Sequence, residues 1–462
     1  MYDEREDEQF SFVAARTAVE RALEGTCGLA LFQHVLDDAA GQAFLHLLRA
    51  LAAEEQNAEE IAQAYSRAFR ELAAAVSGEA LADLPDAWQA YLIARMLQDT
   101  NPWSSQVERA GAASVAPALR AQARRELRLL QQLFALRARQ LWQLTTGAVA
   151  PSLPILRDAW VPWLELVSPA QQGTHIDHPR RALAEQAARS DDWAALAEPL
   201  EHYWSRYGTG IFARYTVLRW QGAGEGLRGI AYPDPVQLAD LIGYEREKSL
   251  LAANIERFLA DLPAHHALLY GSPGTGKSST VKALANRYAE EGMRLVEVRK
   301  EMINDLPALV PQLRERAPHF LVFIDDLSFE EHETAYKGLK VFLEGAVEAR
   351  PTNVLIYATT NRFNLIRENF TDRGQQSEDV HWRDTMDEKQ SLVARFGLRV
   401  TFTTPDQERY LHIASGIARR RGLIIPEETL RTQALQWERQ HAGRSGRLAR
   451  QFIDTLEAEM KM

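Results

Sequence analysis

The sequence predicts an α/β fold with a five-stranded parallel sheet, an all-helical region before it and a helical lid after it. Three observations lead to this prediction. The pattern up to about residue 225 is helical, β-rich runs alternate with helical stretches from 236 to 404, and the chain returns to helix from 405 to 462. Strands that alternate with helices form parallel sheets covered on both faces. We therefore expect three domains, at residues 1–225, 236–404 and 405–462.

The helical region contains an apolar stripe that steps by three or four residues between Leu119 and Leu141, which predicts one amphipathic helix of about six turns. Its other faces carry arginines, including Arg120, Arg124 and Arg128. These fit either a basic helix for DNA or acidic lipid or, as we favour, a core helix with a solvated rim. Eight of the ten tryptophans precede residue 221 and indicate a tryptophan-rich helical core.

Glycine-rich residues 221–226 and the prolines of 232–235 predict a linker after the helical region. The β-rich runs that follow cover residues 267–270, 295–298, 320–324, 354–358 and 398–402. We interpret each run as one strand of the parallel sheet.

The composition excludes several classes of protein. The net charge is −10, and a negatively charged protein as a whole is not built to coat nucleic acid or an anionic membrane. The single cysteine, Cys27, excludes an intramolecular disulfide, suits a reducing compartment and is expected to be buried or half-buried. An acidic start without an apolar stretch, and the lack of any apolar run of about 18 residues, predict a cytoplasmic protein without a membrane segment.

Residues 271–278 read Gly-Ser-Pro-Gly-Thr-Gly-Lys-Ser, a complete G-x-x-x-x-G-K-S phosphate loop between a predicted strand and a predicted helix. Its glycines let backbone N–H groups turn toward phosphates, and the helix N-terminus adds positive potential. We expect Lys277 to reach the outer phosphates of a nucleotide and Ser278 to ligate Mg²⁺. The phosphate-binding residues are then Gly271, Ser272, Pro273, Gly274, Thr275, Gly276, Lys277, Ser278 and Ser279.

The apolar run 320–324 ends in two carboxylates, Asp325 and Asp326. We expect Asp325 to hold Mg²⁺ opposite Ser278, and Asp326 to polarise the attacking water. Glu330 and Glu331 follow closely and are candidates to share the role of base.

Polar residues also follow the next strand, at Thr359, Thr360 and Asn361. In a parallel sheet this strand end lies beside the one that carries Asp325, so a polar side chain there can orient the water. Asn361 is our choice because its amide both donates and accepts hydrogen bonds, and Thr359 and Thr360 are the alternatives.

Two arginines complete the predicted site. Arg395 lies just before the last strand, where we expect it to face a neighbouring subunit and stabilise charge on that subunit's γ-phosphate. Arg447 opens a helix in the lid and is expected to contact the nucleotide, with Arg444 as the alternative.

Taken in order, the phosphate loop, Asp325-Asp326, Asn361, Arg395 and Arg447 resemble the AAA+ ATPases. The run 240–243, Asp-Leu-Ile-Gly, looks like the segment of that superfamily that contacts adenine, which implies that Ile242 and Gly243 bind the base. More narrowly, the runs 276–284, 325–330, 357–362, 395–398 and 445–452 resemble the bacterial family called domain of unknown function 815. The likeness covers about residues 200 to 460, and it implies ATP binding and an AAA+ core.

The chain departs from the AAA+ pattern at two places. Many AAA+ enzymes have Asp-Glu where this chain has Asp325-Asp326, and the shorter carboxylate is compatible with slow hydrolysis. Residues 299–306 lack the aromatic-glycine pair of threading motors, which argues against a polypeptide-threading unfoldase. The charged segment 369–389 is interpreted as an insertion near the subunit edge, either a client contact or an idle loop.

The sequence therefore predicts an oligomeric AAA+ ATPase that uses Mg·ATP to remodel or load a protein or protein–nucleic-acid client. The helical region would recognise that client, and Arg395 would join neighbouring copies. One alternative is a slow nucleotide-dependent switch or scaffold, and another is a small-molecule kinase. Direct nucleic-acid contact through residues 419–421 is a weaker prediction, and no metal site is expected at His265-His266.

Overall fold

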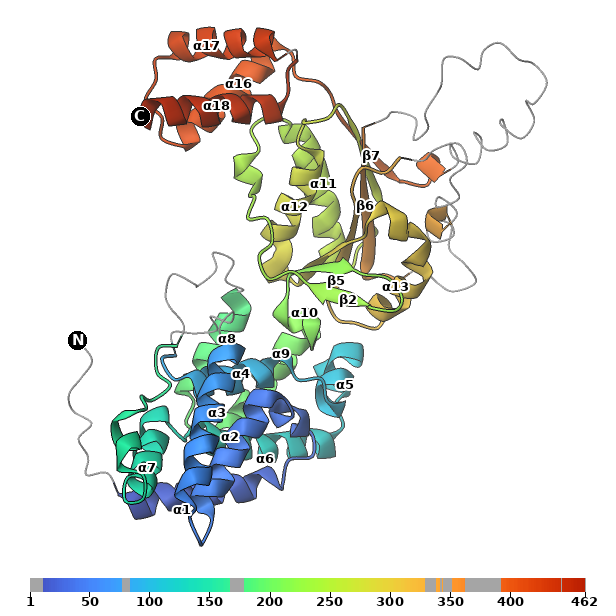
Figure 1. Cartoon of the computed structure of the whole chain (residues 1–462). Coiled ribbons are helices and arrows are strands. Elements are labelled where there is room, and N and C mark those ends of the chain that lie inside the picture. Colours follow the sequence, from blue (N-terminus) through green and yellow to red (C-terminus); the bar gives the residue numbers. More distant parts are fainter. Residues whose placement is uncertain are drawn as a thin grey trace. The chain divides into compact units, whose positions relative to one another are not determined.

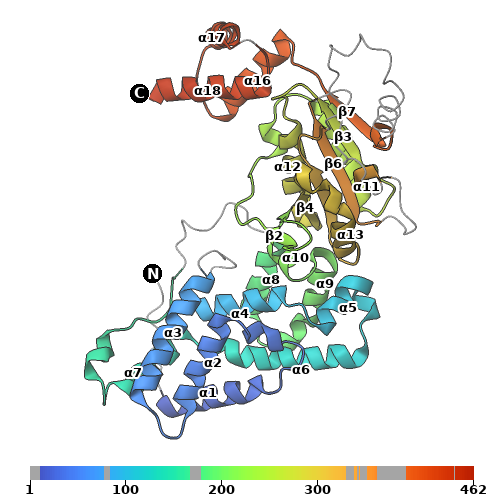
Figure 2. The same cartoon turned by 45° about the vertical axis from the view of Figure 1, so that its right-hand side comes forward.

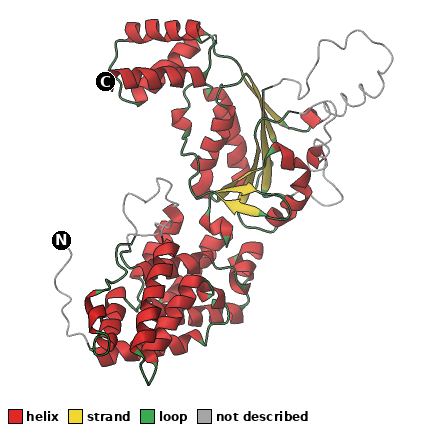
Figure 3. Ribbon diagram, viewed as in Figure 1, coloured by secondary structure: helices red, strands yellow, loops and turns green. Residues whose placement is uncertain are grey.

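The computed structural model describes residues 11–76, 84–166, 178–328, 338–340, 343, 351–361, 392–441 and 443–461. The chain forms two compact units, Met1–Arg214 and Tyr215–Met462 (Figure 1). The first consists of helices, and every strand of the described residues belongs to the second (Figure 3).

The first unit is a helical domain built around a tryptophan-rich core. Trp88, Trp103, Trp163, Trp193 and Trp204 are completely buried, as predicted, and contribute to one continuous apolar cluster. Its helices are α1 (Phe12–Thr26), α2 (Ala39–Ala52), α3 (Ala58–Val76), α4 (Ala87–Gln98), α5 (Pro102–Ala110), α6 (Pro117–Phe134), α7 (Ala138–Val149), α8 (His178–Arg189), α9 (Ala197–Tyr207) and α10 (Ile211–Arg214).

The predicted six-turn helix is wrong, because its stripe is divided between α6 and α7. Arg137 has an extended backbone (φ −89°, ψ 145°) that ends helical continuity before Ala138. The carboxylate of Asp86 accepts a hydrogen bond from the Ala138 N–H at 2.7 Å and so satisfies an N–H group in the first turn of α7. The apolar periodicity predicts one helix, but a hydrogen bond to a residue far away in the sequence caps a new helix at Ala138.

The arginines of α6 support the interpretation of a core helix with a polar rim. Arg120 pairs with Glu201 at 2.8 Å, and Arg124 pairs with Glu198 at 3.4 Å. Arg128 pairs with Asp192 at 3.0 Å. These guanidinium groups are thus neutralised within the unit. Cys27, expected to be buried or half-buried, is exposed because it follows the last turn of α1 at the surface.

The second unit is centred on a sheet of seven strands in the order β2-β1-β4-β5-β6-β3-β7. The strands are β1 (Val217–Trp220), β2 (Leu227–Gly229), β3 (Ala267–Gly271), β4 (Met293–Glu297), β5 (His319–Ile324), β6 (Val354–Thr360) and β7 (Leu398–Phe402). All adjacent pairs are parallel except β1 with β2. The five predicted strands are all present as β3 to β7.

The expected sheet of five strands is nevertheless too small, since β1 and β2 come from residues assigned to the helical region and linker. The glycine-rich stretch is a hairpin turn, closed by a hydrogen bond from the Gln221 N–H to the Gly226 carbonyl at 3.0 Å. Gly222 and Gly226 have φ of 103° and 73°, which glycine tolerates and other residues rarely adopt. The division between the units accordingly follows Arg214 instead of residue 225.

Helices cover both faces of this sheet. The helices α11 (Glu245–Leu259) and α12 (Lys277–Tyr288) share one apolar cluster with one face. The helix α13 (Leu306–Arg314) packs against β6, and Figures 1 and 2 show it on the side opposite α12. The C-terminal helices α16 (Gln407–Arg420), α17 (Glu427–Gln440) and α18 (Gly446–Lys461) form a lid with its own core. No described helix is both long and apolar enough to cross a lipid bilayer.

Candidate nucleotide-binding site

The phosphate loop connects the carboxyl end of β3 to the start of α12, as predicted. Its three glycines have left-handed φ values of 146° at Gly271, 77° at Gly274 and 95° at Gly276. A Cβ atom on Gly271 would lie 2.0 Å from the carbonyl oxygen of Phe402 on the neighbouring strand. Glycine is therefore required there both by backbone conformation and by the closeness of β7.

Lys277 is held above the loop by oxygen atoms. Its Nζ donates to the carbonyl oxygens of Gly271 (2.8 Å) and Ser272 (2.9 Å) and to Oδ1 of Asn361 (2.9 Å). Only 6% of the residue is exposed. Phosphate oxygens offer the ammonium group the same kind of acceptor with additional negative charge, so a nucleotide can replace these partners.

The charge of Lys277 is set by opposing influences. Burial lowers the pKa of its ammonium group, because a charged group loses hydration there. The carboxylates of Asp325 and Asp326 oppose this shift, and the positive charge of Arg447 adds to it. The net result is a lysine with a pKa below its ordinary value.

The carboxyl ends of β5 and β6 bring an acidic group to the first turn of α12. Oδ1 of Asp325 accepts a hydrogen bond from the Ser278 hydroxyl at 2.6 Å and another from the Thr359 hydroxyl at 2.5 Å. A hydroxyl and a carboxylate side by side are oxygen ligands that suit Mg²⁺, which is bound in proteins by one or two carboxylates together with substrate phosphates. The residues present thus fit a magnesium ion.

The second carboxylate lies beside the predicted water-orienting amide. Nδ2 of Asn361 donates to Oδ1 of Asp326 at 2.9 Å, while its own Oδ1 accepts from Lys277. Asp326 has a left-handed backbone, with φ of 51°, which is rare outside glycine. Asn361 therefore links the lysine of the loop to the candidate base.

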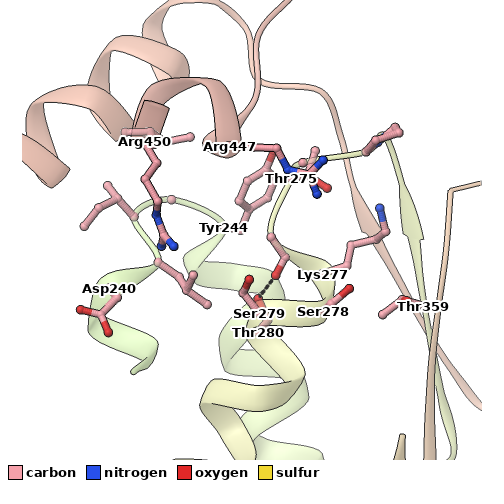
Figure 4. Close-up of a pocket in the computed structure, with 18 of the residues that line it drawn as sticks. Asp240, Tyr244, Thr275, Lys277, Ser278, Ser279, Thr280, Thr359, Arg447 and Arg450 are labelled. Atoms are coloured by element: carbon pink, nitrogen blue, oxygen red, sulfur yellow. Dashed lines mark hydrogen bonds between the residues drawn. The ribbon is translucent and has the colours of Figure 1, made fainter. Parts of the chain in front are cut away.

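A pocket of about 420 Å³ extends from these groups to the lid (Figure 4). Its far side is formed by the predicted base-binding segment and by apolar residues of α16. The residues on that side are Asp240, Leu241, Ile242, Gly243, Tyr244, Ile413 and Ile417. The aliphatic side chains among them, Leu241, Ile242, Ile413 and Ile417, can pack against the face of an aromatic base.

The helix α18 contributes two arginines, Arg447 and Arg450, to the lining of the pocket, and the side chain of Arg450 reaches down from the lid in Figure 4. The backbone N–H of Arg447 donates to the carbonyl oxygen of Gly274 at 3.1 Å, and this hydrogen bond connects the lid to the phosphate loop. Arg444, the alternative, instead bonds Glu438 at 2.7 Å and does not line the pocket.

Arg395 does not join this pocket. In the pairing of β3 with β7, Gly271 is opposite Phe402, whereas Arg395 precedes the amino end of β7. Arg395 instead lines a second pocket of about 400 Å³ at the amino ends of the strands. Glu330, Glu331 and the insertion 369–389 lie outside the described residues.

Sequence reasoning missed several residues that line the pocket: Ile413, Ile417, Arg450 and Lys248. Arg450 had a detectable signal, since it follows Arg447 by three residues on one helix and such residues share a face. Ile413 and Ile417 had none, because their place depends on how the lid packs against Ile242. Of the basic run in the lid, Arg420 pairs with Asp240 at 2.7 Å and Arg421 with Asp454 at 2.6 Å.

The phosphate loop follows β3, the two carboxylates follow β5 on the other side of β6, and a helical lid covers the pocket. These features define the fold of the AAA+ class of P-loop proteins. The family described as protein of unknown function DUF815 matches residues 213–460, and the chain belongs to that family. No curated protein matches the chain.

Solved structures with a similar fold include the RuvB Holliday junction branch migration motor of Thermotoga maritima, with 17% identity and a TM-score of 0.33. That likeness covers 48% of this chain and 63% of the RuvB chain, which is less than two thirds of its length. Another is the AAA domain of FIGL-1 in complex with ADP, with 19% identity, a TM-score of 0.33, and coverage of 46% of this chain and 69% of that one.

Proposed function

We propose that this protein is an ATPase that hydrolyses Mg·ATP at sites shared between neighbouring copies of the chain. The observation that carries the proposal is the convergence of Lys277, Ser278, Asp325, Asp326 and Asn361 at one end of the sheet. These groups belong to three separate segments, and together they supply cation, hydroxyl, carboxylate and amide around the phosphate loop.

Each of these residues has a role that its contacts support. The loop amides and Lys277 bind the β- and γ-phosphates in place of the carbonyl oxygens that the lysine now contacts. Ser278 and Asp325 would hold Mg²⁺, which would supply positive charge beside the phosphates. Asp326 takes a proton from the attacking water, and Asn361 orients that water.

Arg395 is proposed to complete the site of a neighbour. Along β7 the five residues of Leu398–Phe402 separate it from the loop, a length of about 13 Å at the usual rise per residue. It is thus remote from the phosphates of its own chain and serves catalysis only when a second copy presents its phosphate loop to it. An arginine supplied in this way stabilises charge on the transferred phosphoryl group.

The task of the enzyme is proposed to be ATP-driven remodelling or loading of a protein or protein–nucleic-acid client in the cytoplasm. The helical unit supplies the surface for the client, because its described residues contribute nothing to the nucleotide pocket. The lid is tied to the phosphate loop through Arg447 and Gly274, and so moves with the state of the nucleotide.

The decisive experiment measures ATPase activity per subunit against protein concentration, and repeats it with Arg395→Ala mixed into wild type. Shared sites predict activity that rises with concentration and a variant that inhibits the wild type beyond simple dilution. Arg399→Ala, an exposed arginine four residues later, is the matched control and should mix additively. Flat specific activity together with additive mixing of Arg395→Ala would contradict shared sites.

A second candidate is a slow nucleotide-dependent switch that acts through its ATP-bound shape. It is favoured by Asp326, a short side chain whose carboxylate is already engaged by Asn361 at 2.9 Å. A base held in this way reaches water less readily than a longer glutamate. Rapid turnover of ATP by the purified protein alone would count against the switch.

A further inference from the structure

Thr359 lies at the carboxyl end of β6, beside the end of the neighbouring strand β5. It is the penultimate residue of β6, and only 1% of it is exposed. Its backbone carbonyl accepts a hydrogen bond from the Leu327 N–H at 2.6 Å. The residue therefore joins the end of β6 to the turn that follows β5.

The direction of each hydrogen bond at the Thr359 hydroxyl follows from chemistry. An ionised carboxylate only accepts, so Oγ1 donates its proton to Oδ1 of Asp325 at 2.5 Å. The Asp326 N–H only donates, so the same Oγ1 accepts from it at 3.0 Å. One hydroxyl thus contacts both acidic residues of the proposed site.

The first contact orients the carboxylate of Asp325. The hydroxyls of Ser278 and Thr359 both donate to Oδ1, and the Asp326 N–H adds a longer contact of 3.2 Å to the same atom. Within the part of the chain that the structure describes, Oδ2 receives no such donor. The carboxylate is therefore held with one oxygen engaged and the other available for a metal ion or its water.

The second contact fixes the backbone of Asp326. A residue with φ of 51° persists only where its surroundings hold it, and here the N–H of Asp326 is held by Thr359 Oγ1. The next residue, Leu327, bonds the Thr359 carbonyl. This conformation places the side chain of Asp326 within hydrogen-bond distance of Asn361.

We infer that Thr359 is a positioning residue, whose hydroxyl aims Asp325 at Mg²⁺ and Asp326 at the attacking water. This role differs from that of a group that contacts the water itself. The inference rests on the proposed ATPase function.

The test replaces Thr359 by valine, which keeps the β-branched shape and removes the hydroxyl, and by serine, which keeps the hydroxyl. Affinity for a fluorescent ATP analogue is measured with Mg²⁺ and with EDTA, alongside kcat, KM and the melting temperature. For Thr359→Val we expect kcat to fall roughly 10- to 100-fold. The factor by which Mg²⁺ raises the affinity for the ATP analogue should fall by roughly the same amount. Both losses are expected because each lost contact involves a charged or buried partner.

Three further results are expected if the residue acts by positioning. Affinity in EDTA stays within about threefold of wild type, because the loop and Lys277 still bind phosphate. Thr359→Ser recovers most of the activity, and KM changes much less than kcat.

Two outcomes would overturn the inference. One is a Thr359→Val protein that melts at the wild-type temperature and retains wild-type kcat and magnesium enhancement. The other is a serine variant as impaired as the valine variant. Failure of wild type itself to bind Mg·ATP would instead overturn the proposed function, so the two failures are distinguishable.

Discussion

Charged side chains have different partners in the two units. In the helical unit, the buried carboxylate of Glu126 accepts from the backbone N–H groups of Leu31 (2.8 Å) and Phe32 (3.0 Å). Glu201, also buried, accepts from the indole of Trp103 at 2.9 Å and from the guanidinium of Arg120. These partners are permanent parts of the fold, and a ligand has nothing to displace.

In the second unit the buried charge has partners of another kind. Lys277 contacts two carbonyl oxygens of its own loop, and the lysine itself lines a pocket of about 420 Å³. Two of the four non-glycine residues with positive φ among those described, Tyr244 and Asp326, also line that space. The contrast teaches that buried charges of the helical unit are held by groups of its own core, whereas the buried lysine of the second unit lies at the edge of a pocket.

Of the variants that test this contrast, Lys277→Ala is expected to have the largest effect, on the affinity for ATP. Removal of the ammonium group should weaken ATP binding by roughly 100-fold or more, because charge-assisted contacts with phosphate are lost. Titration with a fluorescent ATP analogue measures the change. Lys282→Ala, a half-exposed lysine one turn and a half later on α12, is the matched control and should bind normally. Equal affinity of Lys277→Ala and wild type would contradict the assigned site.

Glu126→Ala is expected to have the opposite profile. It leaves the N–H groups of Leu31 and Phe32 buried without an acceptor and should cost about 2–5 kcal/mol of unfolding free energy. Chemical denaturation measures that loss, and Glu126→Gln, which keeps one acceptor oxygen, should lose less. ATP affinity of the folded variant should equal that of wild type. A large loss of affinity would mean that the units are energetically coupled.

A smaller effect is expected from pH. Burial lowers the pKa of Lys277, so its positive charge is lost at a lower pH than that of an ordinary lysine. Bound phosphate favours the charged form, and ATP affinity should therefore be highest below this pKa and fall as the pH rises through it. Affinity measured across the alkaline range should show this decline in wild type. Lys277→Arg should bind less well throughout but lack the decline, since arginine stays charged.

The smallest effect concerns the exposed ion pairs of α6. Arg124→Ala removes a pair with Glu198 in which both side chains are substantially exposed, so the stability should change by less than about 1 kcal/mol. Thermal denaturation measures it, and DNA binding by gel shift should be weak for wild type and variant alike. Strong DNA binding by wild type that Arg124→Ala abolishes would restore the basic-helix interpretation.

The sequence was most informative where function depends on contiguous residues. The loop from Gly271 to Ser278 needs glycines at set positions and a lysine before a helix, so one segment carries its own signal. Asp325 and Asn361 were predictable because parallel strands bring their carboxyl ends to one edge. Both predictions depend on local rules that the structure obeys.

Residues placed by packing over long distances could not be predicted. The places of Ile413 and Ile417, and the role inferred for Thr359, depend on which helix turns and strand ends face the pocket. Asp86 ends the predicted long helix by capping α7 from a distant part of the chain. The strand β1 was assigned to the helical region because its pairing with β4 is remote in sequence. Tertiary contacts decide each of these cases against local pattern.

The exposed position of Cys27 makes it a site for chemical labelling. It is the single cysteine of the chain, so a maleimide dye attaches to one known site without any engineering. The label lies in the helical unit, in a different unit from the nucleotide pocket. Copies labelled separately with donor and acceptor dyes would report, by energy transfer, whether ATP brings subunits together. Native protein can thus be followed as it assembles, with all its residues intact.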